Sequence, residues 1–155
     1  MSGQVEAINT SRGGVPKQPV FEAVVTGHGL VGDHQNDTYH HGGPDRAVVL
    51  FSLDLIHALQ REGHSITAGS VGENLTVSGV DWDRLVPGTL ITVGEVELRV
   101  TKYATPCTNI RASFLGGDFM RIYQDRYPGW SRVCTRVLKG GVVRPGDPVD
   151  VKGEA

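Results

Sequence analysis

Alternating apolar and polar positions predict a strand-rich protein. In residues 96–103, Val96, Leu98 and Val100 share one face and polar side chains take the other, which is the two-residue period of a half-buried strand. The turn Gly94-Glu95 connects this strand to Thr89–Val93, so the pair is expected to form a hairpin. Further strands are predicted at Val5–Ile8, Val20–Val25, Ala47–Phe51, Asn74–Ser78, Trp130–Leu138 and Val149–Lys152.

Helical patterns are short and few. Ser52 can cap a helix over Leu53–Glu62, because its hydroxyl can accept a hydrogen bond from the first turn, and Gly63 ends it. Shorter helical stretches are expected at Thr108–Leu115 and Asp118–Arg126. About eight strands without regular strand–helix alternation predict a mainly β fold, a closed or nearly closed β-barrel with a few short helices. The 155 residues suit a single domain, residues 1–155.

Composition and charge narrow the function classes. The formal net charge of -2 gives no reason to expect a nucleic-acid-binding surface, so any anion site must be a local cluster of basic groups. The longest apolar run, Ala47–Phe51, is far too short to span a membrane. Residues 1–20 lack the basic and apolar regions of a secretory signal. We therefore expect a cytoplasmic protein in which Cys107 and Cys134 are free thiols.

Cys107 is the strongest candidate for a reactive residue. It follows a predicted strand and precedes a predicted helix, and backbone N–H groups at a helix N-terminus stabilise a thiolate. Thr108 or Asn109 could cap this helix, Arg111 in its first turn could bring a cation close, and Thr105 lies just before the cysteine. This placement favours a nucleophile or a soft metal ligand. The alternative is that Cys107 is a small buried apolar side chain.

Other residues of the same types are expected to be structural. Cys134 lies inside the apolar stretch 131–138, so we expect it to be an inert, buried thiol. Trp82 and Trp130 are expected to pack in the core rather than bind a ligand, and His57 and His64 are expected to lie on the surface.

The segment Gly32–Ala47, most of which belongs to the long polar loop Gly27–Asp45, is the second candidate. Its glycines allow close approach of the backbone to a ligand, and successive N–H groups in such turns can bind an anion. The candidate binding residues here are His40, His41, Gly42, Gly43 and Arg46. An ordinary solvated turn is the alternative, and direct binding of a bare metal ion is a third. That last hypothesis would use Asp33, His34, Asp37, His40 and His41.

The third candidate is the segment Gly69–Gly79, which contains the sequence Gly72-Glu73-Asn74. These three residues could line a ligand site through a glycine turn and polar side chains. Turn chemistry alone also accounts for them, with Gly72 in the turn and Asn74 bonded to its own backbone.

Short motifs across the chain together resemble the MOSC family, named for the C-terminal domain of molybdenum cofactor sulfurases, and most closely its small free-standing bacterial members. The matching pieces are Gly29-Leu30-Val31-Gly32-Asp33, His41-Gly42-Gly43-Pro44-Asp45-Arg46-Ala47, Gly72-Glu73-Asn74-Leu75-Thr76-Val77-Ser78-Gly79, Pro106-Cys107 and Gly146-Asp147. The resemblance implies a β-barrel-like fold and makes Cys107 the functional cysteine of the family.

The resemblance implies two chemical functions. In one, the chain binds the molybdenum cofactor (molybdopterin), Cys107 is the thiolate ligand to molybdenum, and N-hydroxylated compounds are reduced. In the other, Cys107 carries sulfur as a persulfide. The chain lacks the pyridoxal-phosphate desulfurase domain and the iron–sulfur module of longer relatives, so a separate cysteine desulfurase or electron donor is expected as partner, beside a small-molecule substrate. A non-catalytic barrel that binds a small anion or a partner, with Cys107 buried, stays open.

Overall fold

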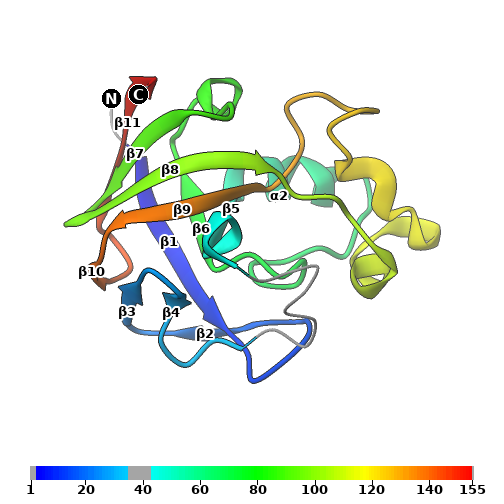
Figure 1. Ribbon diagram of the computed structural model, residues 1–155. Helices are drawn as coiled ribbons and strands as arrows, with labels where there is room; N and C mark the ends of the chain where they lie inside the picture. Colours follow the sequence, from blue (N-terminus) through cyan, green and yellow to red (C-terminus); the bar gives the residue numbers. More distant parts are fainter. Residues whose placement is uncertain (1–2, 35–42, 155) are drawn as a thin grey trace.

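A closed barrel forms the body of the protein in the computed structural model, which describes residues 3–34 and 43–154 (Figure 1). Seven strands follow one another around the ring in the order β11-β7-β8-β9-β5-β6-β1, and β1 pairs with β11 to close it. Their bounds are β1 (Gly3–Thr10), β5 (Val48–Ser52), β6 (Leu75–Ser78), β7 (Thr89–Val93), β8 (Val96–Tyr103), β9 (Val133–Lys139) and β11 (Pro148–Glu154). The predicted mainly β barrel is confirmed.

Smaller elements complete the fold. β2 (Gln18–Val20) extends the sheet beyond β1, and β10 (Gly141–Val143), β3 (Ala23–Thr26) and β4 (Gly29–Leu30) form a separate three-stranded sheet. Helix α2 (Leu53–Arg61) follows β5. The short 3-10 helices are η1 (Pro44–Arg46), η2 (Trp82–Arg84), η3 (Thr108–Ser113), η4 (Leu115–Gly117) and η5 (Phe119–Ile122). Helices η3 to η5 lie to one side of the barrel, beyond the ends of β8 and β9 (Figure 1).

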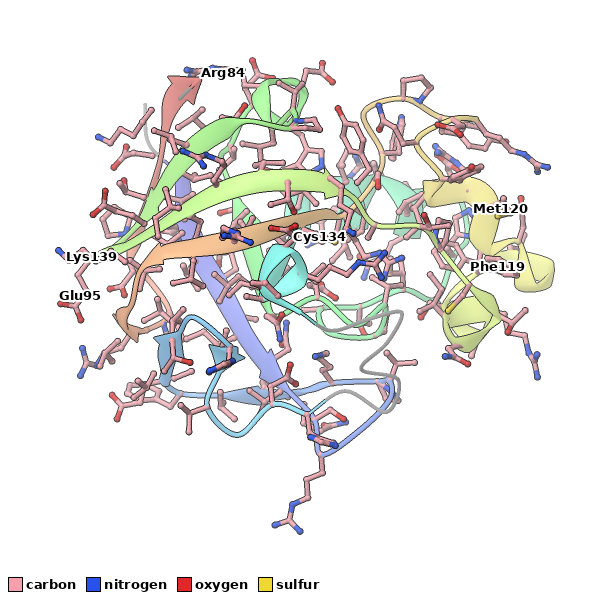
Figure 2. All side chains as sticks on the ribbon, in the orientation of Figure 1. Arg84, Glu95, Phe119, Met120, Cys134 and Lys139 are labelled. Atoms are coloured by element: carbon pink, nitrogen blue, oxygen red, sulfur yellow. The ribbon has the colours of Figure 1, made fainter. Side chains whose placement is uncertain are left out.

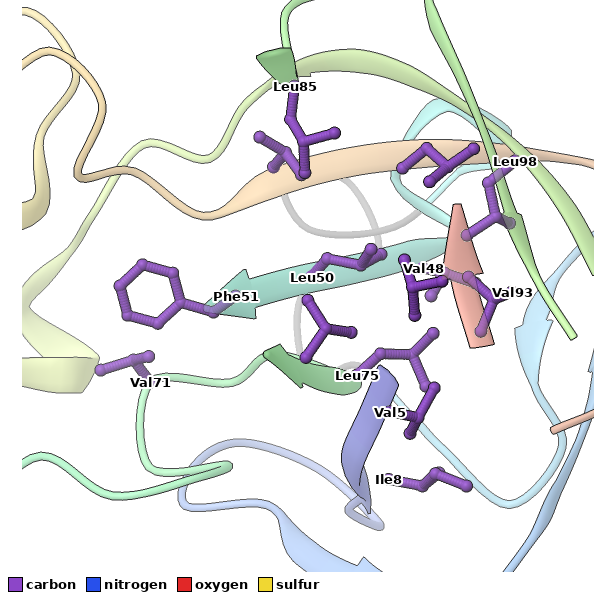
Figure 3. Close-up of a cluster of buried hydrophobic side chains, with 14 of the residues drawn as sticks. Val5, Ile8, Val48, Leu50, Phe51, Val71, Leu75, Leu85, Val93 and Leu98 are labelled. Atoms are coloured by element: carbon purple, nitrogen blue, oxygen red, sulfur yellow. The ribbon is translucent and has the colours of Figure 1, made fainter. Parts of the chain in front are cut away.

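Apolar side chains fill the barrel. Leu50, Leu75 and Leu98 come from three different strands and are 0% exposed, and Figure 3 shows them converging with side chains from β1 and β7. The alternation predicted in β8 holds, because Val96, Leu98 and Val100 are all buried. Burial of this apolar surface drives folding and holds the strand ends in place.

Several predicted elements agree closely with the structure. The hairpin of β7 and β8 has the predicted bounds, with Ile91 paired to Leu98. Helix α2 begins after Ser52, whose hydroxyl accepts a 3.1 Å hydrogen bond from the Leu55 N–H as the capping argument predicts. β5 and β6 are parallel neighbours, and α2 lies in the connection between them. The other strand pairs among the described residues are antiparallel.

Two predicted elements are wrong. The strand predicted at Val20–Val25 is interrupted, since Val20 ends β2 and β3 begins at Ala23, while Phe21 between them is 80% exposed. The helix predicted at Asp118–Arg126 is only the short η5. There the Arg121 side chain packs over the rings of Tyr127 and Trp130 and pairs with Glu62. These tertiary contacts fold the segment back instead of continuing a helix.

The two tryptophans and the histidines His57 and His64 differ in burial. Trp82 is buried, with its indole N–H donating to the Ser131 carbonyl at 2.7 Å, and Trp130 packs against the core. His57 is exposed as predicted. The prediction for His64 is wrong, because its side chain is only 8% exposed and its Nδ1 accepts a hydrogen bond from the Leu115 N–H. The described residues include no helix with the length and apolar character that crossing a membrane requires.

Candidate functional site

A pocket beside the barrel brings Cys107 together with basic side chains from distant parts of the chain. Its volume is about 130 Å³. Its walls come from the loop before β2, from β5, from the turn before β6, from the segment between β8 and η3, and from the start of β9. The lining residues are Gly14, Val15, Lys17, His34, Arg46, Val49, Val71, Gly72, Ala104, Thr105, Cys107, Asn109, Ile110, Arg132 and Cys134. Lys17, Arg46 and Arg132 form a local basic cluster in this pocket. An anion site in a chain of net charge -2 needs such a cluster.

Cys107 stands at the junction that the sequence predicts. It is half-buried, it is the N-cap residue of η3, and its carbonyl accepts a 3.2 Å hydrogen bond from the Ile110 N–H. The predicted capping by Thr108 or Asn109 is wrong, since the helix begins at Thr108 and has no side-chain cap. The thiol is therefore held by the backbone at the edge of a pocket rather than sealed in the core.

Arg132 is the most unusual group in the pocket. Its side chain is only 9% exposed, and it donates from one terminal nitrogen to the Val71 carbonyl at 2.6 Å. Burial lowers the pKa of Arg132, while Cys134, Glu73 and Cys107 act in the opposite direction by attracting its charge. Within the described residues its Nε has no hydrogen-bond partner. A buried cation therefore lies next to the cysteine.

Three hydrogen-bonded polar residues, Lys17, Asp33 and Asn74, form a polar junction that supports the pocket. Asp33 accepts hydrogen bonds from Lys17 Nζ at 2.6 Å and 2.8 Å, and from Asn74 Nδ2 at 2.9 Å. Asn74 in turn accepts from the Val49 N–H at 2.9 Å through its Oδ1. Because the Lys17 and Asp33 side chains are each only 7% exposed, this junction fixes Lys17 and β5 at the pocket with little contribution from solvent.

Glu73 belongs to the same buried layer. It is 0% exposed, its Oε2 accepts from Thr76 Oγ1 at 3.0 Å, and Asn9 Nδ2 donates to Thr76 Oγ1. Burial raises the pKa of Glu73, although its hydrogen bonds and the charge of Arg132 oppose this. Burial thus shifts the balance of Glu73 toward its neutral form, and the side chain lies outside the pocket lining.

The turn at Gly72 explains why this segment needs a glycine. Its φ of +85° belongs to the left-handed region, and a Cβ there would lie 3.0 Å from the Val15 side chain across the pocket. Gly72 thus presents backbone to the pocket, while Glu73 and Asn74 point inward. Gly72 therefore takes the turn conformation that the turn explanation predicts, but the Asn74 side chain bonds Val49 and Asp33 rather than its own backbone. A ligand-binding role for this segment stays a prediction.

The predicted site residues do not all meet. Arg46, Gly72 and Thr105 line the pocket with Cys107, as does His34. Gly43, at the start of η1, and Arg111 are both exposed and lie outside the lining. His40, His41 and Gly42 fall outside the described residues, so their binding role stays a prediction. No group of three or more potential metal-ligating side chains occurs in residues 3–34 and 43–154.

Cys134 and two basic residues were not predicted to belong to the site. Cys134 is 3% exposed, as expected of a buried thiol, but it also lines the pocket, where it faces Arg132 and Arg46. Burial raises the pKa of Cys134, although these cations oppose the shift. Arg132 lies within the stretch predicted as a strand at 130–138, but so does Arg136, so the local sequence did not single it out. Nothing in the local sequence pointed to Lys17.

Both cysteines are free, as expected. Figure 2 shows Cys134 along β9, well away from Lys139 at the other end of that strand. The pocket thus lies at the end of β9 nearest to helices η3 to η5.

Comparisons with known proteins agree with the fold and with the family resemblance. The model of the MOSC domain matches residues 37–150. The chain is 28% identical to the uncharacterized protein YflK of Bacillus subtilis over 135 residues, which cover 86% of this chain and 60% of that protein. It is 29% identical to protein YiiM of Escherichia coli over 108 residues, 67% of this chain and 48% of that protein.

Solved structures share the same architecture. A crystal structure of a hypothetical protein superposes with a TM-score of 0.76 at 25% identity, over 97% of this chain and 68% of that one. The crystal structure of Escherichia coli YiiM gives a TM-score of 0.74 at 22% identity, over 100% of this chain and 71% of that one. The chain spans about half to three-fifths of the length of the curated relatives YflK and YiiM.

Proposed function

Because this chain belongs to the MOSC domain family, we propose that its pocket holds a molybdenum cofactor, with Cys107 as the thiolate ligand to molybdenum, and that it reduces N-hydroxylated compounds. The observation that carries the proposal is the composition of the pocket. Cys107 shares one cavity with Lys17, Arg46 and Arg132, which come from distant parts of the chain.

The donor set of the pocket fits such a cofactor. A cysteine thiolate is a soft ligand, of the type that complements the sulfur ligands already on the metal. Arginine and lysine side chains suit the phosphate group of the pterin, which they bind by charge-assisted hydrogen bonds. The half-buried position of Cys107 leaves its sulfur accessible from the cavity.

The residues of the chain orient the ligand and exclude water. When bound, the cofactor supplies the redox chemistry. The backbone around Cys107 is held by the hydrogen bond from Ile110, and Gly72 allows close approach of the opposite wall. The apolar side chains of Val49 and Val71 displace water from that wall, which strengthens the electrostatic interactions of the nearby cations. A separate electron donor and a small-molecule substrate complete the proposed reaction.

The test begins with the purified protein. Elemental analysis should find molybdenum, and the oxidised extract should show pterin fluorescence. Cys107→Ser should abolish reduction of an amidoxime by the protein supplied with a chemical electron donor, while the exposed-site variant Arg136→Met should keep it. Absence of metal and pterin, together with no reduction after reconstitution with the cofactor, would contradict the proposal.

A sulfur carrier is the second candidate function. It is favoured by the accessibility of the Cys107 sulfur, because thiol exchange requires the attacking thiolate to reach the donor sulfur. Incubation with a cysteine desulfurase and cysteine should add the mass of one sulfur atom to Cys107. The non-catalytic alternative instead predicts that Cys107 resists alkylation in the native protein and that Cys107→Ala leaves binding unchanged.

A further inference from the structure

Arg132 carries a charge that the described protein does not neutralise directly. Arg132 is only 9% exposed, and the ion pairs formed within residues 3–34 and 43–154 do not include it. Its one hydrogen bond in this part of the chain goes to an uncharged carbonyl, that of Val71. A buried cation without a direct counter-ion is costly. An anion taken up from solution would offset that cost.

We propose that this pocket binds a small sulfur oxyanion of the thiosulfate class, anchored by Arg132, and that Cys107 accepts its terminal sulfur. The inference deepens the sulfur-carrier candidate by naming the donor, and it does not require a bound cofactor. It rests on two independent observations in one cavity. Cys107 is half-buried and lines the cavity, and Arg132 lines it too, is nine-tenths buried, and has no hydrogen-bond partner for its Nε and no ion pair among the described residues.

The cavity suits a ligand of this size and charge. Its volume of about 130 Å³ is small, and Lys17 and Arg46 place two further basic side chains on its wall. Of these, Lys17 is already paired with Asp33, so Arg132 is the cation that gains most from an added anion. A guanidinium binds a tetrahedral oxyanion by parallel hydrogen bonds, and one of its terminal nitrogens is already held in place by Val71.

The sulfur transfer balances without any external oxidant or reductant. The thiolate of Cys107 attacks the terminal sulfur of thiosulfate and forms a new sulfur–sulfur bond. The bond between that terminal sulfur and the sulfonate breaks, and sulfite leaves with the electron pair. Cys107 is then a persulfide. Arg132 would hold the sulfonate oxygens before transfer and the leaving sulfite after it.

The first arm of the experiment measures anion binding apart from chemistry. In a Cys134→Ser background, so that only Cys107 reports, sulfite and sulfate should slow alkylation of the native protein by iodoacetamide. Arg132→Met should remove this protection, Arg132→Lys should retain part of it, and Arg136→Met should retain all of it. Arg136 is the matched control, because it lies in β9 only four residues after Arg132 and has a 47% exposed side chain.

The second arm measures transfer. Thiosulfate should add one sulfur atom to Cys107 in the full-length protein and release an equal amount of sulfite. Arg132→Met should slow this about 10-fold to 100-fold, the loss expected for a hydrogen bond to a charged group. Circular dichroism and the thermal midpoint show whether Arg132→Met is folded. If it is unfolded, the transfer rate of Arg132→Lys is compared with that of the parent protein instead.

The outcomes separate this inference from the functions proposed above. Protection and transfer that both depend on Arg132 would support it. Transfer that is equally fast in folded Arg132→Met would overturn the role of Arg132. Failure with thiosulfate, where a cysteine desulfurase still loads Cys107, would overturn the choice of donor and leave the sulfur-carrier function standing. Molybdenum and pterin content is measured separately on the parent protein, so the cofactor proposal is judged by its own readout.

Discussion

The inside of the barrel and the polar junction beside the pocket are both shielded from solvent but are built in opposite ways. Leu50 and Leu75 in the barrel are 0% exposed and make only apolar contacts with their neighbours in the core. The junction, made of Lys17, Asp33 and Asn74, is held by short hydrogen bonds and an ion pair. Apolar contacts tolerate small displacements, whereas each polar partner in the junction must stand at a defined distance.

The difference shows how the site is positioned. The barrel supplies rigid strands, and the junction ties three distant segments to them through Asp33. Ser11 donates its backbone N–H to Asp33 at 2.9 Å, in addition to the bonds from Lys17 and Asn74. We therefore expect damage to the barrel to lower stability alone, and damage to the junction to change both stability and the pocket.

Asp33→Ala should have the largest effect. It leaves the buried Lys17 ammonium and the Asn74 amide without their acceptor, which should cost about 3–5 kcal/mol of unfolding free energy. Urea denaturation measures this loss. At low denaturant, the rate of Cys107 alkylation should also change, because Lys17 and Gly72 lose their support. An alkylation rate equal to that of the parent protein would show that the junction does not position the pocket.

Leu50→Ala should have a smaller or similar effect on stability and none on the site. Removing this fully buried side chain leaves a cavity in the barrel, at a cost of about 2–5 kcal/mol. The folded fraction should still alkylate Cys107 at the parental rate under native conditions. A changed rate in the folded protein would mean that barrel packing, and not only the junction, sets the pocket.

Glu73→Gln should have the smallest effect and a characteristic pH dependence. Burial raises the pKa of Glu73, so the folded protein binds a proton that the unfolded chain releases. The stability of the parent protein should therefore fall as pH rises from the ordinary carboxyl pKa towards the raised one. The variant lacks this fall and should be more stable near neutral pH, by about 1.4 kcal/mol for each unit of pKa shift.

Urea denaturation between about pH 4 and about pH 8 tests this sign. Below the ordinary carboxyl pKa, Glu73→Gln and the parent protein should have similar stability, because both carry a neutral group there. Loss of stability in the variant at neutral pH would instead mean that Glu73 is ionised and neutralises Arg132. That result would also remove the charge argument for an added anion.

The amino-acid sequence by itself determined most strands of the barrel and the position of Cys107 between a strand and a short helix. Strong alternation defined β7 and β8 to the residue, since the two-residue period directly records which face is buried. The position of Cys107 between a strand and a short helix was also visible, because both boundaries are local signals. Local patterns failed at Asp118–Arg126. There Arg121 packs on the rings of Tyr127 and Trp130, which lie beyond the end of the predicted helix.

Only the tertiary structure decided which residues share the pocket. Lys17, Arg132 and Cys134 meet there because β1, β5 and β9 belong to one closed ring, and ring closure depends on pairings between residues far apart in the chain. The structure also separated Gly72, which faces the pocket, from Glu73 and Asn74, which face the interior. Sequence spacing records the order of these residues, but burial and hydrogen bonding across the fold set their directions.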